Sequence, residues 1–342
     1  MSFFLKTLFM KHIIGAKQKK QPFDYEAGEA FVLPADADAT VNNSYYFSAH
    51  SVEGESLYCR LGLRAPHSEV WFAYCRDGRL YTHTLLLYKE EAPLSVSRTE
   101  EGWEVIFDGP LAAEDGSEIA ATFRGLFTSQ EAPVDFFSHM PPVRTAKAMA
   151  GEKWSREFFA EVQKNNQVHY EQTGRLRGHL TLGDEEREID LPCVRDHSFG
   201  KRVWGYMNNH LWLMAVNNTS QLNFSMVSYP AMSLLEVGNF KPGEGEMCYL
   251  LSAEYDRAAV IGEEIPRELP LTLRLTGGRV LHVLATCEHV TEYLFEGGDY
   301  RLLEGIGSFE INGVRYRGII EVGVNGCRER IYNNRTIDEL RA

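Results

Sequence analysis

The sequence predicts a mainly β protein made of two tandem antiparallel β-barrel or β-sandwich domains with one connecting helix. Short apolar runs recur along most of the chain, and turn residues separate them at a spacing of roughly 8–12 residues. Only one internal stretch has the pattern of a long helix. Strands and helices do not alternate, and GxGxxG, P-loop and GxSxG motifs are absent from the sequence. This pattern argues against a doubly wound nucleotide-binding or hydrolase fold.

Composition limits the classes of function. The chain has 342 residues, 44% of them hydrophobic and 24% charged, which is enough for two domains with buried pockets. The formal net charge of −13 argues against a nucleic-acid partner, because such binding needs Lys and Arg side chains that neutralise phosphates. The cysteines form no CxxC pair, so they predict buried thiols in a cytoplasmic protein rather than a secreted one; they are Cys59, Cys75, Cys193, Cys248, Cys287 and Cys327.

Residues 1–24 form a separate amphipathic segment in this prediction. Residues 1–20 contain five lysines, several large apolar side chains and no acidic residue. Lys6 and Lys11 interrupt the apolar run, which is therefore too short for a membrane span, since a span needs about 20 apolar residues. A helix packed on the protein body, or a frayed terminus, is the favoured interpretation. The alternative is an interfacial helix that makes a peripheral contact with an anionic membrane.

The first β-domain is predicted for residues 25–165. Residues 57–63 alternate apolar and polar side chains, as expected for a strand with one buried face. Asp77-Gly78 lies between the apolar runs 70–74 and 80–88, which predicts a hairpin because both central residues of a type I′ turn need a positive φ. Further alternating runs continue to residue 127.

A helix is predicted at about residues 146–163, and we interpret it as the connector between the two domains. Trp154, Phe158 and Val162 are spaced by four, so they share one helix face. The second β-domain is then predicted for residues 166–342. Near its end, Asn312-Gly313 predicts a closing hairpin.

The residues with the most chemical potential lie between positions 191 and 206, where the chain reads Arg195-Asp196-His197-Ser198. If this segment is extended, Asp196 and Ser198 point to one face and Arg195 and His197 to the other. The favoured interpretation is a structural network in which Arg195 or Arg202 binds a carboxylate. The alternative is that Asp196 and His197 act as an acid and a base at the mouth of a cavity.

Two further groups of residues accompany this motif. His169-Tyr170-Glu171-Gln172 would bring Glu171 close to it if the two segments pair as strands, although a solvated strand edge explains this segment equally well. The eleven histidines include no HxH or HExxH pattern, so we predict no metal site and no cofactor. The aromatic residues after the motif fit core packing, which is favoured, or the wall of a lipophilic pocket; they are Trp204, Tyr206, Trp212, Phe224 and Tyr229.

The segment from Arg195 to Trp204 resembles the RDHSWGxRxW motif of the lipocalin-like superfamily that includes carotenoid hydratases (hydroxyneurosporene synthases). It is most similar to the tandem-domain members of unknown activity. Residues 169–175 resemble the YEQxGR segment of the same group, and residues 304–321 resemble its closing hairpin. The resemblance implies two lipocalin-like β-domains in tandem. Phe199 stands where the motif usually has Trp, which removes an indole N–H donor.

The resemblance also implies a ligand and a reaction. The relatives include enzymes that hydrate or cyclise polyene and terpenoid-type substrates, as well as many members of unknown activity, so the resemblance implies a lipophilic small molecule of isoprenoid, polyene or fatty type in a β-barrel cavity. Catalysis would be hydration, cyclisation or isomerisation without a cofactor, with Asp196 or Glu171 as proton donor and His197 as its partner or base. A non-catalytic lipid or terpenoid carrier and a membrane-associated interaction module are the alternatives. The expected ligand-binding residues are Arg195, Ser198, Phe199, Arg202, Trp204, Tyr206, Tyr170 and Trp212.

Overall fold

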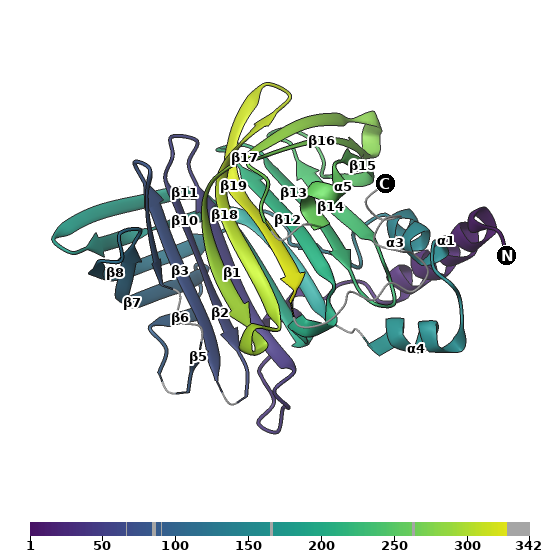
Figure 1. The fold of residues 1–342 in the computed structure, drawn as a ribbon, viewed down its shortest axis with the longest axis horizontal. Coiled ribbons are helices and arrows are strands. Elements are labelled where there is room, and N and C mark those ends of the chain that lie inside the picture. Colours follow the sequence, from purple (N-terminus) through teal and green to yellow (C-terminus); the bar gives the residue numbers. More distant parts are fainter. Residues whose placement is uncertain (66, 84–86, 90, 165–166, 262–263, 327–342) are drawn as a thin grey trace.

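The structure is a computed structural model that describes all residues except 66, 84–86, 90, 165–166, 262–263 and 327–342. Two antiparallel β-barrels lie side by side, and helices gather at the end of the molecule beside the second barrel (Figure 1). The predicted fold class, two antiparallel β-barrels in tandem, is therefore confirmed.

Eight strands close the first barrel. Each pairs antiparallel with the next, and the last pairs with the first; they are β1 (Val41–His50), β2 (Ser56–Leu63), β3 (Ser68–Arg76), β4 (Arg79–His83), β7 (Trp103–Ala113), β8 (Glu118–Thr128), β10 (Val168–Leu182) and β11 (Glu185–Lys201). Alternate side chains, such as Phe47, Phe72 and Phe107, fill its interior. Three short strands pair with β3, β7 and β10 respectively: β5 (Leu87–Tyr88), β6 (Leu94–Arg98) and β9 (Val134–Asp135).

The second barrel is a meander in which consecutive strands pair. Its interior is filled by apolar side chains that include Leu213, Phe224 and Ile320. The strands are β12 (Asn209–Val216), β13 (Gln221–Ser228), β14 (Leu235–Lys241), β15 (Cys248–Tyr255), β16 (Glu268–Leu275), β17 (Val280–Phe295), β18 (Tyr300–Ile311) and β19 (Val314–Asn325). Strand β19 pairs with β12 and closes the barrel.

Strands β10 and β11 lie in the first barrel, which differs from the predicted domain boundary at residue 166. Strand β10 pairs with β8, and β11 pairs with β1, so residues 168–201 complete the first barrel. The Arg-Asp-His-Ser motif is therefore part of the first barrel and not of the second. The connection between the barrels is residues 202–208, which include the 3₁₀ turn η1 (Trp204–Tyr206). Strand partners about 150 residues apart leave no local sequence signal, which explains the misplaced boundary.

The helix predicted at 146–163 consists of two helices, α3 (Pro142–Ala150) and α4 (Arg156–Lys164). Both lie in an excursion between β9 and β10, so they do not connect the barrels. The N-terminal segment forms α1 (Phe3–Lys20) and the short α2 (Tyr25–Glu29), and a further short helix is α5 (Arg257–Ile261). Within the described residues, none of the helices is long and apolar enough to cross a membrane.

Both predicted hairpin turns are present. Asp77 and Gly78 have φ angles of 51° and 71° between β3 and β4. Asn312 and Gly313 have φ angles of 49° and 81° between β18 and β19. Positive φ at both central positions is the requirement of a type I′ turn, so short local motifs correctly placed these strand ends.

The cysteines are free thiols in the described part of the chain. Cys59, Cys75 and Cys193 are buried, and Cys248 and Cys287 are partly exposed. Cys327 lies outside the described residues. The prediction of thiols rather than disulfides is consistent with this arrangement.

The barrels meet along a seam, which we define as the buried contact between outward-facing side chains of β1–β3, β10 and β11 and those of β12, β13 and β17–β19. Trp71 and Tyr58 of the first barrel are fully buried there. The apolar part of the seam also includes Tyr46, Val194, Trp204, Met214, Tyr293, Phe295, Tyr300, Leu302, Ile306 and Ile319. The seam brings together strands that are far apart in sequence.

Candidate active site at the seam of the two barrels

The Arg-Asp-His-Ser motif is extended and sends its side chains to opposite faces of β11, as the sequence predicted. Arg195 and His197 are paired with Phe47 and Tyr45 of β1, whose side chains belong to the interior of the first barrel. Asp196 faces the seam with Tyr46, its partner on β1. Asp196 and His197 therefore cannot act together as an acid and a base.

The inward-facing residues form a closed structural network. Arg195 contacts Glu29 of α2 at 2.7 Å and lies over the ring of Trp103, 4.1 Å from its centroid. The Tyr170 hydroxyl lies 2.6 Å from His197 Nδ1. Helix α2 thus reaches into the first barrel with one carboxylate, which forms an ion pair with the buried guanidinium.

The protonation state of His197 fits a structural role. Burial lowers its pKa, although Glu29 partly opposes the shift. Asn43 Oδ1, which can only accept, lies 2.8 Å from His197 Nε2. The imidazole is therefore neutral, donates from Nε2 and accepts the Tyr170 hydroxyl at Nδ1.

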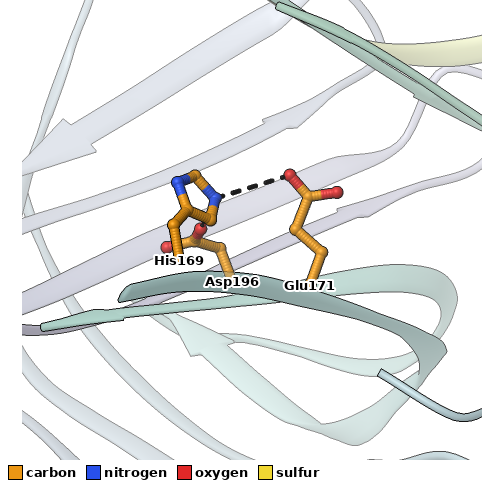
Figure 2. Close-up of side chains that lie close together, drawn as sticks. All are labelled: His169, Glu171 and Asp196. Atoms are coloured by element: carbon orange, nitrogen blue, oxygen red, sulfur yellow. Dashed lines mark ion pairs between the residues drawn. The ribbon is translucent and has the colours of Figure 1, made fainter. Parts of the chain in front are cut away.

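The outward-facing residues form a polar row on the seam. Glu171 on β10, Asp196 on β11 and Tyr46 on β1 are consecutive cross-strand neighbours. Figure 2 shows His169 next to both acids: it forms an ion pair with Asp196, and its Nε2 lies 3.7 Å from Glu171 Oε1. From the second barrel, Asn223 Nδ2 donates to both Glu171 oxygens at 2.6 and 2.7 Å.

Burial and opposite charge determine the protonation of this cluster. Burial alone would lower the pKa of His169, but the Asp196 and Glu171 carboxylates raise it to about 10. Burial alone would raise the pKa of Asp196, but the charge of His169 brings it below its ordinary value. The pKa of Glu171 is raised, chiefly by burial. At neutral pH the cluster therefore contains an imidazolium between two carboxyl groups.

The same three residues are the one group in the described part of the chain that could hold a metal ion. Their ligand atoms all lie within 4.8 Å of one another, and one imidazole with two carboxyl groups suits zinc, iron or manganese. The negative charge is already balanced by protonated His169 and by Arg202, whose charge also lowers the pKa of Asp196. A divalent ion would have to displace the His169 proton. The arrangement therefore favours an ion-paired cluster over a metal centre.

We expect His169 to make stability depend on pH in the alkaline range. Its folded pKa of about 10 lies above the ordinary value of 6.5, so its stabilisation is complete below about pH 6.5 and is lost as the pH rises through 10. In urea unfolding from about pH 6 to pH 10.5, the advantage of wild type over His169→Gln should therefore shrink steadily. His12→Gln, which changes an exposed histidine of α1, should keep the wild-type slope. Parallel curves for wild type and His169→Gln would contradict this assignment.

A second carboxyl pair lies on the same seam. Glu304 on β18 and Glu321 on β19 are buried cross-strand neighbours. The Tyr46 hydroxyl donates to Glu304 Oε1, which joins this pair to the Asp196 row. His210 Nε2 lies 2.5 Å from Glu321 Oε1, and its Nδ1 lies 2.6 Å from the Tyr300 hydroxyl.

The environment gives the two carboxyl groups opposite states. Burial raises the pKa of Glu304 well above its ordinary value, and the charge of Glu321 raises it further. Burial also acts to raise the pKa of Glu321, but the hydrogen bond and charge of His210 bring it below its ordinary value. Two like charges this close do not both ionise unless a cation lies beside them. Glu304 is therefore a neutral carboxylic acid at neutral pH, and Glu321 is a carboxylate.

Aromatic rings line the seam around Glu304. Trp71 stacks on Tyr293 at a centroid distance of 4.5 Å, and Trp212 lies 5.6 Å from Tyr46. Several buried polar atoms have no hydrogen-bond partner among the described residues, namely Trp71 Nε1, Trp212 Nε1, Thr291 Oγ1 and Glu304 Oε2. Buried polar atoms are rarely left unpaired in folded proteins, so these atoms have hydrogen-bonding capacity that the described side chains do not use.

The remaining predicted site residues lie on the two faces of β11, in the connection 202–208 that follows it, and on β12. Phe199 stacks on Phe31 at 4.3 Å on the inward side, so the missing indole N–H lies away from the seam. Ser198 is buried on the seam side, and Trp212 contacts the His169 ring. Arg202 lies over Trp204, which in turn stacks on Phe295 at 4.4 Å, and Tyr206 stacks on Tyr229 at 5.7 Å. Trp204 thus packs in the apolar part of the seam.

Sequence reasoning missed half of the seam. The sequence patterns point to neither His169 nor Tyr46 as a site residue, and to no member of the Glu304, Glu321 and His210 group. A signal exists for the two acids: each stands alone in an apolar strand, Leu302-Leu303-Glu304-Gly305-Ile306 and Ile319-Ile320-Glu321-Val322. An acid in such a position must be paired or neutral, which marks it for attention.

Comparison with known proteins places the chain in a family. The model of the family described as "Domain of unknown function (DUF7064)" matches residues 30–326. The chain belongs to this family. No curated protein matches the chain.

Solved structures support the fold. The chain is similar to a putative AttH protein from Nitrosomonas europaea, with a TM-score of 0.54, 11% identity, and coverage of 86% of this chain and 96% of the other. It is also similar to kievitone hydratase from Nectria haematococca, with a TM-score of 0.53, 12% identity, and coverage of 90% and 94%. At this identity the likeness shows the shared fold alone, and the more specific resemblance to carotenoid hydratases stays a prediction.

Proposed function

We propose that the protein catalyses acid–base hydration, cyclisation or isomerisation of a lipophilic unsaturated small molecule at the seam, with Glu304 as the proton donor. The observation that carries this proposal is the neutral, buried carboxyl group of Glu304. Protonation of a carbon–carbon double bond needs an acid that stays protonated in a dry site. Kievitone hydratase, which shares the fold, is by name an enzyme of this general class.

Both barrel interiors and the seam are packed with buried side chains in this structure, and we place the ligand at the seam because the chemistry is there. Both interiors are filled by continuous apolar clusters of side chains. The seam instead combines an acid, a carboxylate and aromatic faces. Trp71, Tyr46 and Trp212 would contact the substrate, because aromatic rings stabilise a developing carbocation.

The proposed step is balanced in protons and electrons. The Glu304 O–H bond breaks as its proton forms a new C–H bond with one alkene carbon, and the neighbouring carbon becomes cationic. In hydration, water then forms a C–O bond to that cation and returns a proton to the Glu304 carboxylate. In isomerisation or cyclisation, the proton lost from an adjacent carbon returns to Glu304 instead. Glu321 remains ionised beside His210 and stabilises the positive charge throughout.

The test is deuterium incorporation. Purified protein would be incubated in D₂O with a panel of acyclic isoprenoids, polyenes and unsaturated fatty acids, and products analysed by mass spectrometry. We expect at least one compound either to gain the mass of one D₂O, with one deuterium bound to carbon, or to exchange a carbon-bound hydrogen for deuterium. Native mass spectrometry and thermal shift on the same panel separate binding from turnover. Ligand binding without any deuterium uptake would favour the non-catalytic carrier, and neither binding nor uptake would overturn the proposal.

A further inference from the structure

The N-terminal helix exposes an unusual concentration of apolar side chains. The described residues include fifteen exposed large apolar side chains, and seven of them lie within the first thirteen residues. They are Met1, Phe3, Phe4, Leu5, Leu8, Phe9 and Ile13, and the six within α1 are 42–67% exposed. Soluble surfaces rarely gather so many apolar side chains in one place, which marks an interaction surface.

Helix α1 is held in an orientation that keeps these side chains outward. Its opposite face buries Met10 and Ile14 against α3 and α4. Lys6 Nζ donates to the Glu152 carbonyl at 2.6 Å, and Gln18 Nε2 donates to the carbonyls of Phe137 and Met140 at 2.6 and 3.0 Å. Contacts near both ends fix the helix on the body, so the exposed side chains are not free to turn inward.

Charge indicates which kind of surface fits this helix. Residues 1–20 carry five lysines and no acid in a chain with a formal net charge of −13. The large apolar side chains lie in the first three turns of α1, and Lys17, Lys19 and Lys20 lie in its last turn. In Figure 1, α1 lies at the outer end of the molecule, on the side away from the first barrel. An anionic surface would therefore attract this end and repel the acidic remainder.

We propose that α1 docks the protein on an anionic lipid bilayer, with Phe4, Leu5, Leu8 and Phe9 in the interfacial region and exposed lysines at the lipid head groups, among them Lys11, Lys19 and Lys20. Apolar and cationic side chains are not separated into two faces along α1, so the amphipathic segment predicted from the sequence is wrong in this respect. The proposal rests instead on the number of exposed apolar side chains and on the lysines among them. A second copy is disfavoured, because pairing the same surfaces of two copies would bring together the exposed lysines of both helices, with no acid in either helix to balance them. This proposal is independent of the catalytic proposal at the seam.

The test is sedimentation of the full-length protein with vesicles of equal parts phosphatidylglycerol and phosphatidylcholine, compared with pure phosphatidylcholine vesicles. We expect the anionic vesicles to bind at least about tenfold more tightly, and this preference to shrink in high salt. Phe4→Ser/Leu8→Ser and Lys11→Glu/Lys19→Glu should each weaken binding at least about tenfold. These side chains are exposed, so the variants should unfold at the wild-type temperature.

Matched control variants carry the same changes elsewhere on the surface. Val290→Ser/Leu294→Ser removes two apolar side chains of similar exposure from β17, and Arg79→Glu/Arg315→Glu reverses two exposed charges at hairpins. Both controls should bind vesicles as wild type does. Equal binding to both vesicle types, or equal losses in the controls, would overturn the proposal. So would a lipid-free dimer that Phe4→Ser/Leu8→Ser converts to monomer, because α1 would then be a contact between copies.

Discussion

Replacing Glu304 with Gln should lower kcat at least about 100-fold on any substrate that the deuterium screen identifies. The amide keeps the size of the side chain and can still accept the Tyr46 hydroxyl hydrogen, but it has no acidic proton to transfer. General acid catalysis by a positioned carboxyl group contributes about 10²–10⁴-fold, which sets the expected loss. Initial rates at several substrate concentrations would measure it, and KM should change much less than kcat.

Controls separate this effect from a folding defect. Glu304→Gln should unfold at or slightly above the wild-type temperature, because it removes a carboxyl group that lies beside the Glu321 carboxylate. Glu310→Gln, at an exposed position of the same strand, should leave kcat unchanged. Tyr46→Phe removes the hydrogen bond that lowers the pKa of Glu304, so the alkaline limb of the kcat profile should move to higher pH. Wild-type kcat in Glu304→Gln would remove Glu304 as the proton donor.

Local sequence patterns predicted much of the fold and one decisive feature of the motif. Asp77-Gly78 and Asn312-Gly313 identified two hairpins because their positive φ angles are a property of the residues themselves. The period of two in an extended chain likewise predicted that Asp196 and His197 point to opposite faces. That one geometric fact assigns His197 to the interior network and Asp196 to the seam.

Features that depend on distant strand pairing could not be predicted in this way. Strand β11 pairs with β1, the first strand of the barrel, which lies about 150 residues earlier in the chain. The motif therefore belongs to the first barrel. The helical residues 142–164 looked like a boundary because they interrupt the strands, although the chain then returns to the same barrel. The contact between Tyr46 and Glu304 joins residues 258 positions apart, and nothing local in either segment indicates the other.

The motif is best explained as architecture that also positions a site. Its inward residues hold α2 against the first barrel, while Asp196 holds the His169 imidazolium against the seam. Tyr46 follows Asp196 in the cross-strand row and reaches Glu304 of the second barrel. The same adjacent strands therefore hold helix α2 in the first barrel and position Tyr46, the hydrogen-bond partner of Glu304. The structural and the functional interpretation of the motif are compatible.

Replacing Arg195 with Met should destabilise the protein by about 3–5 kcal/mol, the usual effect of removing one partner from a buried ion pair. Arg195 is 1% exposed and contacts Glu29 at 2.7 Å, so the variant leaves a carboxylate buried beside a neutral His197. The cation–π contact with Trp103 is lost as well. Urea unfolding followed by circular dichroism would measure the free energy of unfolding for each variant.

A double-mutant cycle shows whether the loss comes from the stranded charge. Glu29→Gln/Arg195→Met should be more stable than Arg195→Met alone, because the amide needs no counter-ion in the barrel. Arg187→Met removes an exposed partner of Glu185 at the same 2.7 Å and should change the free energy of unfolding by no more than about 1 kcal/mol. If Arg195→Met is as mild as Arg187→Met, α2 is not held by this ion pair. If it is severe and Glu29→Gln gives no recovery, the loss reflects packing around Trp103 rather than charge.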